Sequence, residues 1–167
     1  MSWNKKQIKQ HKRAANALNK IIFEVAEFIK NNFNTTDVAV RQFIAKQYKI
    51  YHLVSDKQKS IVSFSKDTSN VHFYAEEPRK IKKGDLIMID IWAKLNERGA
   101  PFADITWMIH GGRKLSGRYI DAFKIVAVAR DKVIKYLQNS FKNKTMPIGK
   151  EIDAVARNYL EKCGYSD

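Results

Sequence analysis

The chain has 167 residues, 44% of them hydrophobic and 11% aromatic, which excludes a disordered chain and a small disulfide-stapled scaffold. One domain is expected for this length. The single cysteine, Cys163, excludes an intramolecular disulfide and a cysteine-rich metal site, so we expect a reducing, cytoplasmic location. The chain has no apolar run of the length that a secretory signal or a membrane span needs, and we expect neither export nor membrane insertion.

The charge is strongly basic, with 31 Lys and Arg against 17 Asp and Glu and a net charge of +14. Residues 1–60 carry 12 basic and 4 acidic side chains, residues 113–167 carry 12 and 6, and residues 61–112 carry 7 of each. Such a surface attracts nucleic acid and other polyanions at long range, and it is also typical of a well-solvated soluble protein. Charge alone leaves both interpretations open.

The first 50 residues have the pattern of two helices. Apolar residues recur at helical spacing and predict an amphipathic helix from about residue 6 to 32, on the face formed by Leu18, Ile21, Ile22, Val25, Ala26 and Ile29. Thr35, Thr36 and Asp37 supply N-cap chemistry for a second, shorter helix ending near Gln47. We therefore expect helices within residues 6–49.

The middle of the chain predicts strands, and the end predicts helices again. Short strands are expected at residues 61–65 and 71–74, and a hairpin is expected from residues 86–95 and 102–110, so the sheet occupies residues 60–112. Helical patterns follow at about 118–143 and 151–163. The predicted fold class is α+β, with an antiparallel sheet packed against helices in a single domain spanning residues 1–167.

Two carboxylates lie within the predicted hairpin. Side chains alternate along a strand, so Asp90 shares a side with Met88 and Trp92, and Asp104 shares a side with Thr106. If the hairpin turns about Glu97, facing residues have numbers that sum to about 194, and the two carboxylates face each other. The alternative is an asymmetric turn, in which Pro101 shifts the register and one Asp caps a loop.

Facing carboxylates need something that neutralises them, because like charges across a ladder are destabilising and burial makes ionisation costlier. Three arrangements would do so: one shared proton, a Lys or Arg inserted between the two groups, or divalent metal ions held by both carboxylates. The pairing arithmetic does not choose among them.

Specific segments resemble a known family of enzymes. The run His72-Phe-Tyr-Ala, the run Gly84-Asp85-Leu86 leading to Asp90, and the run Phe102-Ala-Asp104-Ile-Thr106 are similar to those of the pita-bread metallopeptidases, namely Xaa-Pro aminopeptidases, methionine aminopeptidases and prolidases. The resemblance implies one half of a pita-bread fold. It also implies that Asp90 and Asp104 are metal ligands and that His72, eighteen residues before Asp90, is a catalytic histidine in contact with substrate.

The resemblance further implies two divalent metal ions, which manganese, cobalt, iron or zinc could supply, and a peptide substrate with a free N-terminus. The Xaa-Pro likeness adds proline at the second position of that peptide. The family completes its site with a His and two Glu, and uses a further catalytic His, and no segment of this sequence matches them. We therefore interpret the chain as the N-terminal half of a catalytic domain, truncated or split, with an incomplete ligand set.

Two other interpretations come from different classes of protein. The first is a non-catalytic module that binds nucleic acid or the ribosome through a basic patch at the start of the first helix, formed by Lys5, Lys6, Lys9, Lys12 and Arg13. The second is self-association, or association with a second-half subunit, through apolar surface left open on the sheet and on the helix at 118–143. His11, His52 and His110 are expected to be surface or structural residues, and Cys163 a small apolar residue.

Overall fold

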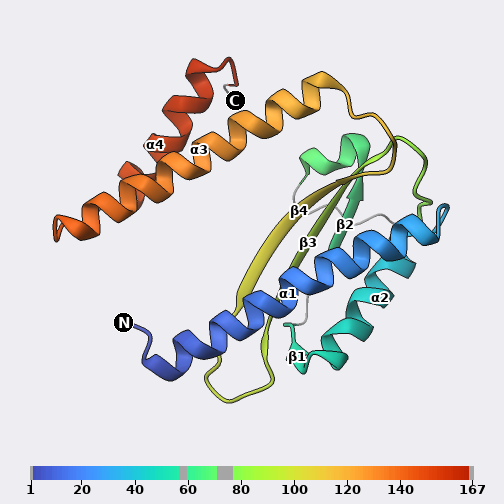
Figure 1. The fold of residues 1–167 in the computed structure, drawn as a ribbon, viewed down its shortest axis with the longest axis horizontal. Helices are drawn as coiled ribbons and strands as arrows, with labels where there is room; N and C mark the ends of the chain where they lie inside the picture. The colour runs from blue at the N-terminus through green and yellow to red at the C-terminus, as the bar shows by residue number, and fades with distance from the viewer. Residues whose placement is uncertain (1, 57–59, 71–76, 166–167) are drawn as a thin grey trace. The chain divides into compact units, whose positions relative to one another are not determined.

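The computed structural model describes residues 2–56, 60–70 and 77–165. Figure 1 shows the helices and strands of the chain. The helices are α1 (Lys5–Asn31), α2 (Asp37–Ile50), the short 3₁₀ helix η1 (Ser65–Ser69), α3 (Gly117–Lys142) and α4 (Gly149–Lys162). The strands are β1 (Leu53–Val54), β2 (Ile61–Phe64), β3 (Leu86–Leu95) and β4 (Ala103–His110). These elements confirm the predicted α+β class, while the strand predicted at residues 71–74 lies outside the described residues.

The chain divides into two compact units, Met1–Arg113 and Lys114–Asp167. The first contains α1, α2 and the sheet, and the second contains α3 and α4, which pack against each other. In the second unit the Lys132 ammonium lies 4.8 Å from the centre of the Tyr159 ring. Among the described residues, no helix combines the length and the apolar character needed to cross a bilayer.

Side-chain caps set the starts of the first two helices. The Asn4 side chain accepts a hydrogen bond from the Gln7 amide, and the Gln7 side chain accepts one from the Asn4 amide, which forms a capping box. The Thr36 hydroxyl accepts from the Ala39 amide at 3.1 Å. The predicted cap of the second helix is thereby confirmed, and α1 begins one residue earlier than the apolar pattern indicated, because Asn4 satisfies its free amides.

Both helices of the first unit cover one face of the sheet (Figure 1). The predicted apolar face of α1 is buried there except for Ala26, which is half-buried. Alternate residues of β3 face these helices and have almost no exposed surface: Ile87, Ile89, Ile91, Ala93 and Leu95. Truncating one of these isoleucines to alanine would cost about 2–5 kcal/mol of unfolding free energy.

Strand β3 is the centre of the sheet. β4 pairs antiparallel with one of its edges, and β1 and β2 pair with different parts of the other edge. The β3 residues that alternate with the buried isoleucines lie on the face opposite α1 and α2, and they are Leu86, Met88, Asp90, Trp92 and Lys94. This second face carries the acidic residues singled out in the sequence.

Candidate metal centre

Asp90 and Asp104 lie on the same face of two paired strands, but they are not directly opposite. Asp90 faces Thr106, and Asp104 faces Trp92, so the numbers of facing residues sum to 196. The prediction of direct opposition was therefore wrong, because the hairpin turns about Arg98 rather than Glu97. The residue opposite Asp104 is therefore Trp92, two residues along β3 from Asp90, and the two carboxylates become diagonal neighbours that still share a face.

Thr106 holds the Asp90 carboxylate. The Thr106 hydroxyl donates a hydrogen bond to Asp90 Oδ1 at 2.7 Å, across the facing pair that the register creates. The hydrogen bond fixes one oxygen of a half-buried carboxylate without neutralising its charge. Thr106 was part of the resembling segment, but its contact with Asp90 depends on the register and was not expected from the sequence.

Electrostatics couple the two carboxylates. Although Asp104 is exposed, partial desolvation raises the pKa of its carboxyl, and the negative charge of Asp90 raises this pKa further. A hydrogen bond from the Ile105 backbone acts in the opposite direction on the Asp104 pKa. Two like charges close together on one face are a favourable place for a cation.

Tyr48 of α2 contacts β3 close to the two carboxylates. Residues 91–93 of β3 fall between its pairing with β1 and its pairing with β2, and there the Trp92 carbonyl accepts hydrogen bonds from Tyr48 Oη at 3.2 Å and Ser55 Oγ at 2.8 Å. Burial raises the pKa of Tyr48 to about 12; a hydrogen bond with Ser60 opposes the shift, and the charges of Asp104 and Asp90 add to it. The sequence offered no signal for this placement.

The donor chemistry fits a hard divalent cation, but the number of donors does not fill its coordination shell. Two carboxylates offer at most four oxygens, whereas such cations take about six ligands or more. No group of three or more His, Cys, Asp and Glu side chains with metal-site geometry occurs among the residues that the structure describes. His72, the predicted catalytic histidine, lies outside them.

The other singled-out histidines are placed in different parts of the fold. His11 Nδ1 lies 2.9 Å from the Phe102 carbonyl oxygen, and the His11 ring packs on Trp3. His52 adopts a left-handed conformation, with φ of 53°, in the turn after α2. His110 ends β4 opposite Leu86.

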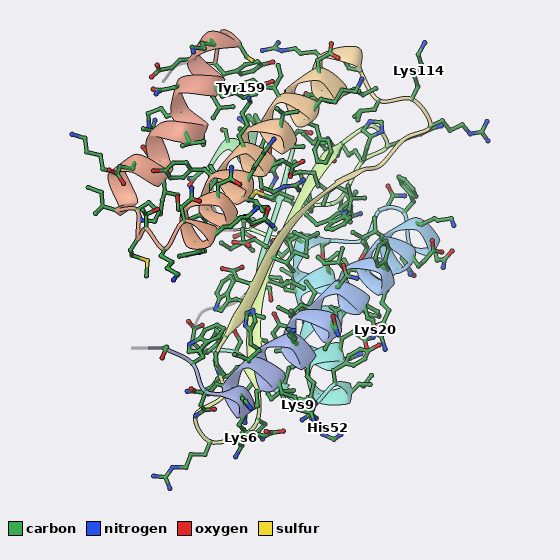
Figure 2. All side chains as sticks on the ribbon, turned by 60° about the vertical axis from the view of Figure 1, so that its left-hand side comes forward. Lys6, Lys9, Lys20, His52, Lys114 and Tyr159 are labelled. Atoms are coloured by element: carbon green, nitrogen blue, oxygen red, sulfur yellow. The ribbon has the colours of Figure 1, made fainter. Side chains whose placement is uncertain are left out.

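The basic patch predicted for nucleic acid is exposed along the first turns of α1. Figure 2 shows Lys6 and Lys9 near the N-terminal end of that helix. The charge of Arg13 is partly neutralised, since this residue forms a 3.0 Å ion pair with Glu97 in the hairpin turn. Nothing in the fold or in the comparisons with known proteins supports a nucleic-acid module over the peptidase interpretation.

Comparisons with known proteins identify the family. Residues 9–167 match Metallopeptidase family M24, so the chain belongs to this family and the predicted resemblance is confirmed. M24 metallopeptidases use divalent metal ions and act on peptides. No curated protein sequence matches the chain.

Solved structures show the same fold. An X-Pro aminopeptidase from Thermotoga maritima superposes with a TM-score of 0.81 at 20% identity, over 99% of this chain and 43% of that one. A Xaa-Pro dipeptidase from Bacillus anthracis has a TM-score of 0.76 at 22% identity, over 97% of this chain and 42% of that one. A prolidase from Pyrococcus furiosus has a TM-score of 0.75 at 21% identity, over 97% and 44%. The chain therefore has one half of a pita-bread fold and spans less than half the length of these proteins.

Proposed function

We propose that this chain contributes Asp90 and Asp104 as ligands for divalent cations in a metal-dependent peptidase of the Xaa-Pro type. The observation that carries the proposal is the shared face of the two carboxylates, one diagonal step apart on β3 and β4. Family membership supports it, since M24 peptidases use divalent metals. The metal would be manganese, cobalt, iron or zinc, all of which accept carboxylate ligands to different degrees.

The geometry favours a cation over the other two ways of neutralising the pair. Diagonal neighbours in an antiparallel ladder are about 7–8 Å apart, which is wide for a single shared proton and suits one or two metal ions between the carboxylates. No Lys or Arg forms an ion pair with Asp90 or Asp104 among the described residues. A bound cation is therefore the arrangement that best fits the wider gap.

Each residue has a role in this proposal. Asp90, oriented by Thr106, and Asp104 would hold the metal, whose chemistry is to polarise a peptide carbonyl and lower the pKa of a bound water. His72 would donate a hydrogen bond to the substrate, as the family resemblance implies. The substrate would be a peptide with a free N-terminus and proline in its second position, and the site of action the cytoplasm.

The remaining ligands are part of the proposal as well. Two carboxylates leave a coordination shell incomplete, so further donors would come from a second half of the catalytic domain, on the same polypeptide or on a second-half subunit. Exposed apolar side chains on α3, among them Phe123 and Val126, offer surface for such an association or for self-association. On its own the chain should bind metal weakly and hydrolyse no peptide.

A manganese titration followed by NMR tests the ligand assignment. Paramagnetic Mn²⁺ should broaden the amide signals around Asp90 and Asp104 first, with an affinity no tighter than about millimolar for a two-ligand site. The variants Asp90→Asn and Asp104→Asn should each abolish this selective broadening. Glu27→Gln removes an exposed carboxylate from α1 and is the matched control, which should broaden as the unmodified chain does.

Two outcomes would refute the assignment. Broadening centred on other acidic residues, or broadening that survives both aspartate substitutions, would show that these carboxylates are not the ligands. The substrate part is tested separately, by supplying the second half of a pita-bread domain and measuring release of the first residue from Xaa-Pro and Xaa-Ala peptides. Equal rates on the two peptides would reject the Xaa-Pro preference while leaving the metal site intact.

A further inference from the structure

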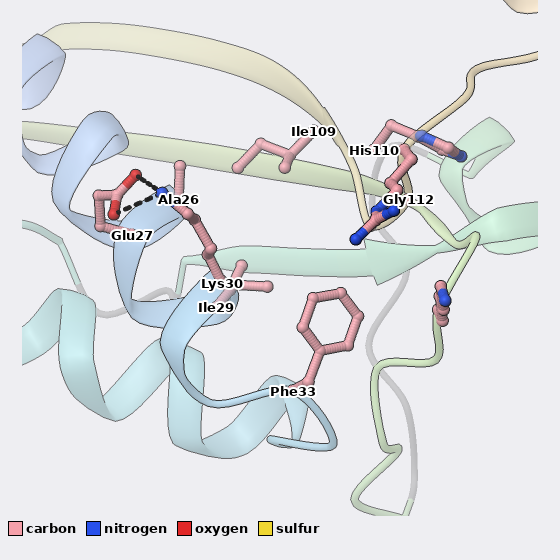
Figure 3. Close-up of a pocket in the computed structure, with 11 residues that line it drawn as sticks. Ala26, Glu27, Ile29, Lys30, Phe33, Ile109, His110 and Gly112 are labelled. Atoms are coloured by element: carbon pink, nitrogen blue, oxygen red, sulfur yellow. Dashed lines mark hydrogen bonds and ion pairs between the residues drawn. The ribbon is translucent and has the colours of Figure 1, made fainter.

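A cavity of about 680 Å³ lies in the first unit, where the C-terminal end of α1 meets the end of β4 (Figure 3). Its apolar lining comes from Ala26, Ile29 and Phe33 on the helix side and from Ile109 on the sheet. Ile109 belongs to the alternating set of β4 that faces the helices, whereas Asp104 is on the other set. The cavity is therefore separate from the candidate metal centre.

The wall formed by the end of β4 includes a close approach of His110 to Gly112. A Cβ atom at Gly112 would lie 2.8 Å from His110 Cε1, so a larger residue there would require the imidazole to move. Figure 3 shows His110 and Gly112 on one side of the cavity and the Phe33 ring, from just beyond α1, on another. The two sides leave an apolar space between them rather than closing on each other.

More cationic than anionic side chains line the cavity. Lys30, Lys83 and Arg113 line it together with a single carboxylate, Glu27. Glu27 is already paired, since its Oε1 lies 3.1 Å from Lys30 Nζ (Figure 3). No ion pair joins Lys83 or Arg113 to another residue in the part of the chain that the structure describes. The lining of this apolar space thus includes two cationic side chains, Lys83 and Arg113, that form no ion pair among the described residues.

We propose that this cavity binds a small organic anion, with an apolar body inside the cavity and a carboxylate between Lys83 and Arg113. The volume lies within the range of about 300–1,000 Å³ that small-molecule sites occupy, and such sites combine apolar walls with a few polar groups that fix orientation. Charge complementarity selects the ligand, because a neutral apolar molecule would leave both cations unpaired and a cationic one would be repelled. The proposal does not depend on the peptidase activity.

Binding of 2-naphthoate to the full 167-residue chain, measured by calorimetry or by NMR shifts, tests the proposal. The neutral isostere 2-naphthylmethanol should bind several-fold more weakly. Lys83→Ala and Arg113→Ala should each weaken naphthoate binding about two- to fivefold, as expected for exposed charge pairs, and leave the alcohol unaffected. Lys20→Ala, an exposed lysine of α1 that does not line the cavity, is the matched control and should change neither ligand.

A cavity-filling variant separates this site from non-specific binding. Ala26→Leu extends a half-buried α1 side chain into the cavity and should weaken both ligands more than tenfold, while thermal unfolding confirms that the variant is folded. If it does not fold, Phe33→Ala replaces it; this variant removes an apolar wall of the cavity at an exposed position and should also weaken both ligands, and unchanged binding would count against the proposal. Equal affinities for the acid and the alcohol would overturn the proposal, as would naphthoate binding that survives cavity filling or responds equally to Lys20→Ala. Tighter binding of an acidic peptide than of naphthoate would overturn the small-molecule assignment.

Discussion

The chain contains carboxylates in two contrasting settings. Asp37 is 1% exposed, and both of its oxygens have partners: Oδ1 accepts from the Arg79 amide at 2.8 Å, and Oδ2 lies 2.8 Å from Arg41 Nη1. Asp90 and Asp104 are diagonal neighbours on one face of the sheet, and the negative charge of Asp90 raises the pKa of Asp104. The charge of Asp37 is therefore balanced by the Arg41 ion pair, whereas Asp90 and Asp104 bring two negative charges together.

This difference in partners distinguishes Asp37, a structural carboxylate, from the diagonal pair, which is suited to binding a ligand. Asp37 joins the start of α2 to the segment before β3, where its own amide also donates to the Arg79 carbonyl. All of its interactions stabilise the folded chain. The diagonal pair contributes repulsion to the folded chain instead, and such a cost is typical of sites whose stabilising partner is a ligand.

The largest expected effect is at the structural carboxylate. Asp37→Ala should lower the free energy of unfolding by about 3 kcal/mol or more, because it leaves the mostly buried Arg41 guanidinium without its ion pair. Urea denaturation measures the change. The double variant Asp37→Ala/Arg41→Met should recover much of the loss, since no uncompensated charge remains. A double variant less stable than Asp37→Ala alone would contradict this account.

Tyr48 provides a smaller effect that depends on pH. Its pKa is about 12 in the folded chain, against 10 for an ordinary tyrosine, so the unfolded chain ionises first as pH rises. Stability that is fully present below pH 10 should therefore be lost between pH 10 and 12, by about 2–3 kcal/mol. Tyr48→Phe should remove this part of the alkaline slope in denaturation curves. An unchanged slope in the variant would show that Tyr48 ionises equally readily in both states.

The smallest effect is expected at the diagonal pair, and it has the opposite sign to that at Asp37. Asp104→Asn should raise stability at pH 7 by no more than about 0.5 kcal/mol, because it relieves repulsion at an exposed position. The pKa of Asp104 is raised on folding, so its unfavourable contribution should disappear as pH falls below the ordinary aspartate value. Denaturation at pH 3 and pH 7 measures both parts. A destabilised Asp104→Asn would mean that this carboxylate is structural.

Much of the fold could be predicted from local patterns. The apolar spacing from Leu18 to Ile29 predicted the buried face of α1, and Thr36 predicted the start of α2. Alternation along β3 and β4 correctly placed both aspartates on one face, because a register error of two residues leaves every side chain on its own side of the sheet. The same error made the two carboxylates appear directly opposite.

Other parts of the site could not be predicted, because they depend on contacts between distant segments. The hydrogen bond between Thr106 and Asp90 requires the true register, which a turn of several residues left open. Tyr48 meets β3 through a hydrogen bond to the Trp92 carbonyl, 44 residues along the chain, and no sequence pattern marks a contact of this kind. The cationic cavity likewise combines the end of α1 with residues about fifty to ninety positions later.

The sequence by itself determined the helices, the hairpin and the face on which its two aspartates lie, since each of these follows from short-range periodicity. The family came from the resemblance of a few short segments to known proteins. Only the tertiary structure decided which residue stands opposite which, what holds each carboxylate, and where cations gather without acidic partners. Those features arise from the packing of segments far apart in the chain, and periodicity within one segment carries no information about them.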